Sequence, residues 1–571
     1  MRFRIFRSGF VIAAVLAAVW CSHMVSAGDM PDAPSYRGLV VGRATLDEVR
    51  AALGDSPVET RSPQDLRYPA VGNPALSDRL YFRNSRLELV TAASADPDYP
   101  DRATIERTLG VPEAEVLFQT QQYLDYTQRG LKFICRPDGA TTGVIYFQPQ
   151  PRRVPVDHPN ARIDLRRQLQ APPRSGVPMQ LRVGTAEESI APERFDDLLP
   201  DGKGSLLSLG ENLFARVAVF ERGERKVVIA GLDVFGLGPW DVQKLRDSLA
   251  EKGFPNVIIA MSHTHANVDT IGFYGHYPER YAARILNRTE AAVMNAAANM
   301  TGVAGLRLGS SEMPLDGGRV VDLVRNGRDP GVLDPTVNVL QVIGDDGRPI
   351  VNVIQLACHP EVIELDKTRA LSPDFVGTLC RETSARLGGQ SVFLNGALGG
   401  MLTPDTRFRT QAAAEEMGRR LTEFVVQAAA NSVASESETL SIETRTVEYP
   451  VTGESVRTFL ENAPGPVEMH DGHVRTEMSV VWIGDAQFIT VPGELLPDIG
   501  FRVTQKMTGR LRAIIGLANG ELGYLVPSFD FRVGGYEERT GPGSAGGEIT
   551  QAVGLELAVT RPDNLSTGNP E

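Results

Sequence analysis

The chain has 571 residues, of which 42% are hydrophobic and 23% are charged. This composition is typical of a folded protein large enough for more than one domain, and it excludes a mainly disordered chain. The net charge of -13 leaves no basic stripe to displace the counterions of a phosphate backbone, which argues against nucleic acid as the main partner.

The first 27 residues have the parts of a secretory signal peptide. Basic residues precede an apolar stretch from Phe10 to Trp20, and a small-x-small cleavage pattern ends at Ala27. The apolar stretch is too short to span a bilayer, and no later segment is apolar for long enough to do so. The sequence therefore predicts a secreted or periplasmic protein without a transmembrane segment.

Three cysteines, at positions 135, 358 and 380, remain after residue 27. They are too few for a disulfide framework. We interpret them as buried apolar side chains, with a Cys358–Cys380 bridge as the alternative.

Residues 28–148 contain a weak internal duplication. GRATLDEVRAALG (Gly42–Gly54) is echoed by DRATIERTLG (Asp101–Gly110), and strand-like segments follow both copies. Each copy predicts a short helix, capped by Thr45 or Thr104, followed by a small antiparallel sheet. The copies resemble small α+β modules of bacterial envelope proteins. We interpret the region as a binding or packing module rather than a second active site.

Residues 149–178 are rich in proline and arginine and predict a linker. From residue 179 to residue 571, strands alternate with helices. Strands at Val227–Leu237 and from Val257 onward, with a helix at Pro239–Gly253 between them, predict a βαβ unit. We therefore expect an α/β domain with mixed sheets. Further helices are expected at Pro278–Asn299 and Gln411–Ala430, and further strands at Ala215–Phe220, Val337–Ile343, Ser391–Leu394 and Val480–Val491.

Two apolar strands of this domain end on histidines. The segment VIIAMSHTH contains His263 and ends on His265, and the segment VNVIQLACHP contains His359. In an extended chain positions i and i+2 share a face, so both imidazoles of the first motif can enter one pocket. Ligands of α/β proteins bind at such strand ends, and zinc favours His and carboxylate ligands. A zinc site is the first hypothesis, and hydrogen-bonded strand-end histidines are the alternative.

Two later strand ends carry further candidate ligands. Glu494 follows an apolar strand in QFITVPGELLPDIG, and Tyr524 stands at the end of the next strand in LANGELGYLVP. Four strand ends thus present His, His, Glu and Tyr.

With these motifs in order, residues 179 to about 557 resemble the neutral/alkaline non-lysosomal ceramidases, zinc amidases that cleave ceramide to sphingosine and fatty acid. The resemblance implies a ceramidase-like zinc hydrolase domain. Its motifs are SHTH (262–265), ACHP (357–360), FLNGALGGMLTP (393–404), VPGE (491–494) and NGELGYLVPSFDFRVGGYE (519–537).

The resemblance assigns roles to single residues. It places the family's zinc ligands at His263, His359, Glu494 and Tyr524, and its second tyrosine at Tyr536. The family's interval of twelve residues between the two tyrosines is kept, since 536 − 524 = 12.

Two further groups have candidate catalytic roles. His265 is a candidate general base or acid, with a role in shaping the pocket as the alternative. Tyr536 is a candidate donor to a developing oxyanion, with a packed tyrosine as the alternative. Arg319, Arg325 and Arg328 all compete for the position of the family's substrate-recognising arginine.

The chain also departs from the family pattern. Gly396 stands where ceramidases carry a serine that takes part in amide cleavage, and Ala266–Asp269 replaces the S-G-P-G that follows HTH. No counterpart of the family's C-terminal immunoglobulin-like domain follows the last motif.

The sequence thus predicts a secreted zinc hydrolase that uses metal-bound water to cleave the amide bond of an N-acyl lipid. A lipid-like substrate allows for peripheral contact with a membrane. The alternatives are a catalytically degenerate lipid- or partner-binding protein on the same fold, and a zinc esterase.

Overall fold

The computed structural model describes residues 33–149 and 180–562, with gaps at 56, 58, 63–64, 71–72, 84, 94–97, 119–120, 317, 330–331, 471 and 533–534. The predicted signal peptide and all but the first residue of the predicted linker lie outside the described residues. The chain divides into two compact units, Met1–Arg152 and Arg153–Glu571.

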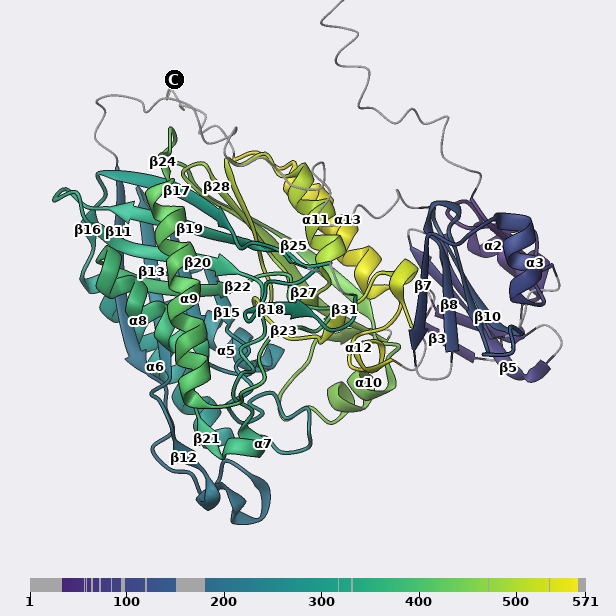
Figure 1. Cartoon of the computed structure of the whole chain (residues 1–571), viewed down its shortest axis with the longest axis horizontal. Coiled ribbons are helices and arrows are strands. Elements are labelled where there is room, and N and C mark those ends of the chain that lie inside the picture. The colour runs from purple at the N-terminus through teal and green to yellow at the C-terminus, as the bar shows by residue number, and fades with distance from the viewer. Residues whose placement is uncertain are drawn as a thin grey trace, which may run out of the picture. The chain divides into compact units, whose positions relative to one another are not determined.

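The first unit is built on an eight-stranded antiparallel sheet in the order β3-β4-β5-β6-β10-β9-β8-β7. Its two longer helices, α2 and α3, lie on one face of the sheet (Figure 1). Helix α2 and strands β3–β6 form one half of the unit, and helix α3 and strands β7–β10 form the other. The two halves of the sheet meet at the β6–β10 pair. The elements are β1 (Ser35–Tyr36), β2 (Leu39–Val40), α2 (Leu46–Leu53), β3 (Glu59–Ser62), β4 (Asp65–Ala70), β5 (Asn73–Arg83), β6 (Arg86–Ala92), α3 (Arg102–Leu109), β7 (Ala114–Phe118), β8 (Gln121–Tyr126), β9 (Leu131–Cys135) and β10 (Thr141–Phe147).

The two helices of this unit begin at different kinds of cap. Thr45 and Glu48 form a capping box at α2, as the sequence indicated for Thr45. At α3 the prediction for Thr104 was wrong, because Asp101 is the N-cap and its carboxylate accepts from the backbone N–H of Thr104 at 2.8 Å. Aspartate is the stronger N-cap, so the helix begins three residues earlier.

The second unit contains three sheets. Their orders are β15-β14-β13-β11-β16, β22-β20-β19-β17-β24 and β25-β27-β28-β30, with β26 paired to β27. The strands are β11 (Leu181–Ser189), β13 (Phe214–Arg222), β14 (Arg225–Leu232), β15 (Val257–Met261), β16 (Thr301–Gly302), β17 (Gly305–Glu312), β19 (Thr336–Ile343), β20 (Pro349–Leu356), β22 (Gln390–Asn395), β24 (Val433–Ala434), β25 (Leu440–Pro450), β26 (Met469–His470), β27 (His473–Ile483), β28 (Ala486–Thr490) and β30 (Leu511–Ile515).

Three short strand pairs and nine described α-helices complete this unit. The pairs are β12 (Ser208–Leu209) with β21 (Ala370–Leu371), β18 (Val324–Asn326) with β23 (Leu402–Pro404), and β29 (Glu494–Leu495) with β31 (Tyr524–Leu525). The helices are α5 (Pro239–Glu251), α6 (Glu279–Ala298), α7 (Leu365–Thr368), α8 (Phe375–Leu387), α9 (Gln411–Ala430), α10 (Glu454–Glu461), α11 (Pro497–Lys506), α12 (Tyr536–Arg539) and α13 (Gly546–Ala558).

All three sheets follow one pattern. Antiparallel strands are followed by a helical crossover to a parallel edge strand, through α5 from β14 to β15, through α8 from β20 to β22, and through α11 from β28 to β30. The predicted βαβ unit is the first of these. Since parallel strands end at the same edge, each sheet brings two strand ends together.

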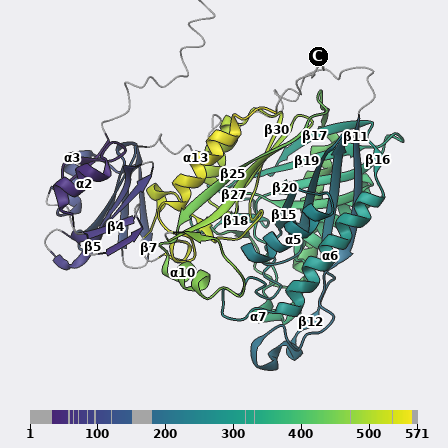
Figure 2. The ribbon, with the colours of Figure 1, turned by 180° about the vertical axis from the view of Figure 1, so that it is seen from behind.

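One apolar core joins the three sheets. It includes Ile229 and Ile258 of the first sheet, Val353 of the second, and Val481 and Phe488 of the third. Helix α6 packs on β11 and β13, α9 on β17 and β19, and α13 on β25 and β27. Figure 1 shows α9 in front of its sheet, and Figure 2 shows α6 and α13 from behind. Strands covered on both faces are expected to be almost continuously apolar, as β15 (VIIAM) is, whereas β11 (LRVGTAEES) and β25 (LSIETRTVEYP) also carry charged residues.

Most elements expected from the sequence are present, and one is divided. The stretch Val480–Val491 was expected to be one strand, but it is the second half of β27 and all of β28, joined by a turn at Gly484. Gly484 has a φ of +60°, which glycine adopts without strain and which allows the tight turn.

The cysteines and the helices bear on two further expectations. The three described cysteines are buried and unpaired, as the sequence analysis favoured. Among the described residues, no helix combines the length and apolar character needed to cross a bilayer.

Each unit has a core of its own, so we expect the second unit to fold without the first. A chain lacking residues 28–148 should melt cooperatively by circular dichroism and should bind as much metal as the full chain, measured by elemental analysis. Joint loss of folding and metal would show instead that the first unit is required.

Candidate metal centre

His263 is positioned by the end of the first parallel strand pair. Strand β15 ends at Met261, and the N–H groups of Ser262 and His263 donate to the carbonyls of Leu232 and Val234 at 2.9 and 3.0 Å. His263 then adopts a φ of +68°, so the expected extended geometry from His263 to His265 was wrong. The turn still brings the two imidazoles together, with ring centroids 5.1 Å apart.

Backbone carbonyls orient two of the histidines. Nδ1 of His263 lies 2.6 Å from the carbonyl oxygen of Phe235, and Nδ1 of His359 lies 2.9 Å from that of Leu402. An Nδ1–H that donates to a carbonyl leaves Nε2 free as a metal ligand. Both histidines are therefore held in the tautomer that a metal site requires.

Glu494 and Tyr524 complete the predicted ligand set. Glu494 lies opposite Tyr524 in the parallel β29–β31 pair. The Glu494 carboxylate lies 2.8 Å from Nε2 of His359 and 3.6 Å from Nε2 of His263. The Tyr524 hydroxyl lies 3.5 Å from Nε2 of His359. The structure thus brings His263, His359, Glu494 and Tyr524 to one point.

The ionisation of this group follows from burial and from one carboxylate. Burial lowers the pKa of His263 to about 3. Burial also opposes the charged form of His359, but the hydrogen bond and charge of Glu494 outweigh it and raise the His359 pKa to about 9. Burial raises the pKa of Tyr524 well above its usual value, and the charge of Glu494 adds to this. Without a metal, His359 and Glu494 therefore form a buried ion pair.

His265 stands beside these four residues. One ligand atom from each of His263, His265 and His359 lies within 4.8 Å of the others, which is close enough to share a metal ion. Nε2 of His265 is buried and has no hydrogen-bond partner among the described residues. Oriented imidazoles, a carboxylate and this orphaned nitrogen fit a divalent transition metal.

A small pocket of about 50 Å³ opens onto the site. It is lined by His263, His265, Glu494, Tyr524 and Tyr536, while His359 is fully buried. Tyr536 is 46% exposed, and its ring lies 5.9 Å from that of Tyr524. The apolar lining comes from Phe235, Ile271, Phe273, Val456, Phe459, Leu460 and Leu522.

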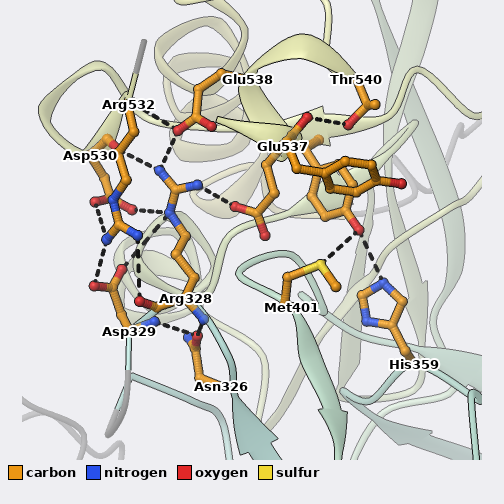
Figure 3. A network of polar contacts seen from close by, with 12 residues as sticks. Asn326, Arg328, Asp329, His359, Met401, Asp530, Arg532, Glu537, Glu538 and Thr540 are labelled. Carbon is orange, nitrogen blue, oxygen red and sulfur yellow. Dashed lines mark hydrogen bonds and ion pairs between the residues drawn. The ribbon is translucent and has the colours of Figure 1, made fainter. Parts of the chain in front are cut away.

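Arg328 fixes the segment that carries Tyr536. Its guanidinium donates to Glu537 and Glu538 of α12, at 2.5 Å each, and to Asp530 at 2.7 Å. Figure 3 shows these carboxylates around Arg328, with Arg532 beside them. The Arg328 side chain is only 5% exposed, so all its donors face protein groups.

Of the three candidate arginines, Arg328 is therefore occupied by its ion pairs with α12. Arg319 is half-exposed and pairs with Asp405 at 3.1 Å. Arg325 lies on β18 and is exposed. Arg328 and Arg319 thus have carboxylate partners of their own, while Arg325 points to solvent. None of the three lines the pocket.

The position of the family serine has no room for a side chain. A Cβ at Gly396 would lie 2.5 Å from Nε2 of Gln355 and 3.0 Å from Cβ of Ala357. A serine there would require Gln355 to move, so Gly396 is part of the packing of this chain.

Sequence reasoning missed the groups that orient the site. Phe235 supplies a carbonyl to His263 and stacks on its ring with centroids 4.6 Å apart. Every residue has a backbone carbonyl, so the sequence does not indicate which one will orient a histidine. The one available signal was that Phe235 follows β14, which is the parallel neighbour of β15. Asp233, which directly follows β14, is buried and pairs with Arg216 at 2.8 Å.

Fold and site together define a ceramidase-like α/β protein with a candidate transition-metal centre. A crystal structure of neutral ceramidase from Pseudomonas aeruginosa has the same fold, with a TM-score of 0.55, 16% sequence identity, and coverage of 67% of this chain and 74% of that chain. A structure described as ceramidase complexed with C2 gives a TM-score of 0.54, 16% identity and coverage of 67% and 75%. The sequence matches no protein-family model and no curated protein.

We expect Glu494→Ala to lose bound zinc and His265→Ala to keep about one zinc per chain. Glu494 is the charged group between two oriented imidazoles, whereas His265 is oriented by no carbonyl in the described part of the chain. Elemental analysis of the purified variants measures this. Zinc retained by Glu494→Ala would contradict the ligand set, and zinc lost from His265→Ala would make His265 a ligand.

Arg328→Met should destabilise the fold by about 3–5 kcal/mol, because it leaves the carboxylates of Glu537 and Glu538 buried without their cation. Urea unfolding measures the loss. Arg319→Met is the matched control and should cost at most about 1 kcal/mol, since its ion pair is exposed to solvent. Equal effects of the two changes would argue against a special role for Arg328.

Proposed function

We propose that this protein is a secreted, zinc-dependent hydrolase that cleaves the amide bond of an N-acyl lipid. The observation that supports it most is the convergence of His263, His359, Glu494 and Tyr524 beside an apolar pocket. The likeness to ceramidase structures agrees with this proposal at the level of the fold.

The donor set suits catalysis as well as binding. Zinc in such a site polarises a carbonyl group and lowers the pKa of water that it holds. The protein holds its ligands firmly, because the carbonyls of Phe235 and Leu402 fix the two imidazoles before metal binds. Preformed ligand geometry of this kind would hold the substrate carbonyl in a fixed position relative to the groups that react with it.

His265 and Tyr536 would act on the substrate itself. Burial lowers the pKa of His265 to about 3, with the charge of His359 adding to the effect. Its imidazole is therefore neutral near pH 7. The observation that supports a role in proton transfer is geometric, because His265 lines the pocket and its Nε2 has no hydrogen-bond partner among the described residues. The Tyr536 hydroxyl, at the pocket wall, would donate to the oxygen of the carbonyl under attack.

The apolar lining supports a lipid-like substrate. Phe273, Phe459 and Leu460 offer a surface for an acyl chain but few hydrogen bonds. Such a chain reaches the enzyme from a membrane or a micelle, so we include peripheral membrane contact in the proposal. Export follows from the predicted signal peptide at residues 1–27.

The packing at Gly396 favours a second candidate, an amphiphile-binding protein without catalysis. The family's serine cannot be accommodated there without moving Gln355. A zinc esterase on the same fold is the third candidate, because esters are cleaved without protonation of a poor leaving group. Turnover of matched amide and ester substrates separates the three candidates.

The first test compares the zinc-loaded protein with the protein stripped by a chelator, using a fluorescent N-dodecanoyl amide. We expect turnover with zinc, its loss on stripping, and its return on adding zinc. Turnover that persists in the stripped protein would contradict metal-dependent hydrolysis, and binding without turnover would favour the second candidate.

Tyr536→Phe should keep zinc and lower kcat by about a hundredfold, with little change in KM, as loss of one oxyanion donor does. Stopped-time product analysis and elemental analysis measure the two quantities. Tyr277→Phe, at a tyrosine outside the pocket that binds Asp241, is the control. An unchanged kcat in Tyr536→Phe would reduce Tyr536 to a wall residue.

A further inference from the structure

One carboxyl group in the pocket has no assigned task. His263, Glu494 and Tyr524 are proposed ligands, and His265 and Tyr536 have proposed roles in proton transfer and carbonyl binding. Thr540, which also lines the pocket, donates its hydroxyl to the Tyr536 carbonyl at 2.8 Å. Glu521 remains, on the loop between β30 and β31.

Glu521 is firmly placed with half of its carboxyl group unused. Its Oε1 accepts from the backbone N–H of Gly523 at 2.7 Å. Its Oε2 is buried and has no hydrogen-bond partner among the described residues. The residue is only 7% exposed, so bulk water has little access to Oε2 as a hydrogen-bond partner.

The loop around Glu521 is tied to the metal centre on two sides. Asn519 accepts from the N–H of Ile259 in β15 at 2.9 Å, which fixes the loop to the strand before His263. The carbonyl of Gly523 accepts from the N–H of Glu494 at 2.9 Å. Gly523 therefore links the Glu521 carboxyl to the backbone of Glu494, and both residues line the same pocket.

An unpartnered carboxyl oxygen in an apolar pocket is costly, and in a native structure it calls for an explanation. A carboxyl oxygen accepts a hydrogen bond. A substrate hydroxyl that enters the pocket can donate to the unpartnered Oε2.

We propose that Glu521 is a specificity-determining residue that binds a hydroxyl group of the substrate close to the scissile amide. The inference rests on the proposed function and narrows its substrate class to N-acyl amphiphiles with a hydroxyl group a few bonds from the amide nitrogen. A pocket built around a polar group rejects an analogue that leaves that group unpaired.

The test uses two amides that differ at one position, N-dodecanoylethanolamine and N-dodecanoylpropylamine, which carry a hydroxyl and a methyl group. We expect the zinc-loaded protein to favour the hydroxylated amide by at least about tenfold in kcat/KM. Glu521→Leu should bring the ratio to about one. Glu521→Gln, which keeps a donor and an acceptor, should retain most of the preference.

Glu290→Gln is the matched control, because Glu290 lies on α6, pairs with Lys252 at 3.2 Å and does not line the pocket. It should leave the ratio unchanged. The inference is overturned if the protein shows no preference, if Glu521→Leu keeps the preference, or if the Glu521 variants lose zinc, which would make Glu521 part of the metal centre.

A binding measurement separates this inference from the proposed function. Displacement of a fluorescent fatty amide by the same two compounds reports recognition without turnover. If there is no turnover, but the hydroxylated amide binds better and Glu521→Leu abolishes that preference, the hydrolase is rejected and the Glu521 site is supported. Turnover with an unchanged ratio would reject the Glu521 site alone, and equal or absent binding of both compounds without turnover would reject both.

Discussion

The buried carboxylate of Glu494 is the constraint on which the rest of the site depends. A carboxylate removed from water is stable only with charged or hydrogen-bonding partners, and Glu494 has them in His263, His359 and Tyr524. His263 and His359 follow strands of two different sheets, and Tyr524 lies opposite Glu494 in the short β29–β31 pair, so the pairing and packing of the strands must be satisfied together. A divalent cation at this point would replace the proton that His359 holds against Glu494.

The fold solves this problem by repetition. In each of the three sheets a helical crossover places a parallel edge strand beside its predecessor, and the site residues follow the ends of those strands. The shared apolar core holds the three pairs of ends against one another. Because the packed sheets are rigid, side chains on the connecting loops converge with little freedom to move apart.

A second buried charge network supports the pocket wall. Arg328 and Arg532 face the carboxylates of Asp329, Asp530, Glu537 and Glu538, so acidic groups outnumber basic ones. Burial and the neighbouring carboxylates raise the pKa of Glu537 to about 7, against the lowering effect of Arg328. This network joins the loop after β18 to α12 and thereby holds Tyr536 beside Tyr524. It explains why Arg328 is not free for substrate.

The sequence by itself predicted the α/β class and the first crossover helix, α5, because hydrophobic periodicity is a local signal. Polar residues at strand ends marked five of the candidate site residues, and the resemblance to ceramidases added Tyr536 and the roles of all six. Sequence reasoning misplaced the N-cap of α3, ran two strands of a hairpin into one, and assumed an extended path from His263 to His265. Tertiary structure alone decided which arginine is buried, that Gly396 has no space for a serine, and that carbonyls of Phe235 and Leu402 orient the imidazoles. These depend on contacts between residues far apart in the chain, and backbone carbonyls are the same in every sequence, so no local pattern could reveal them.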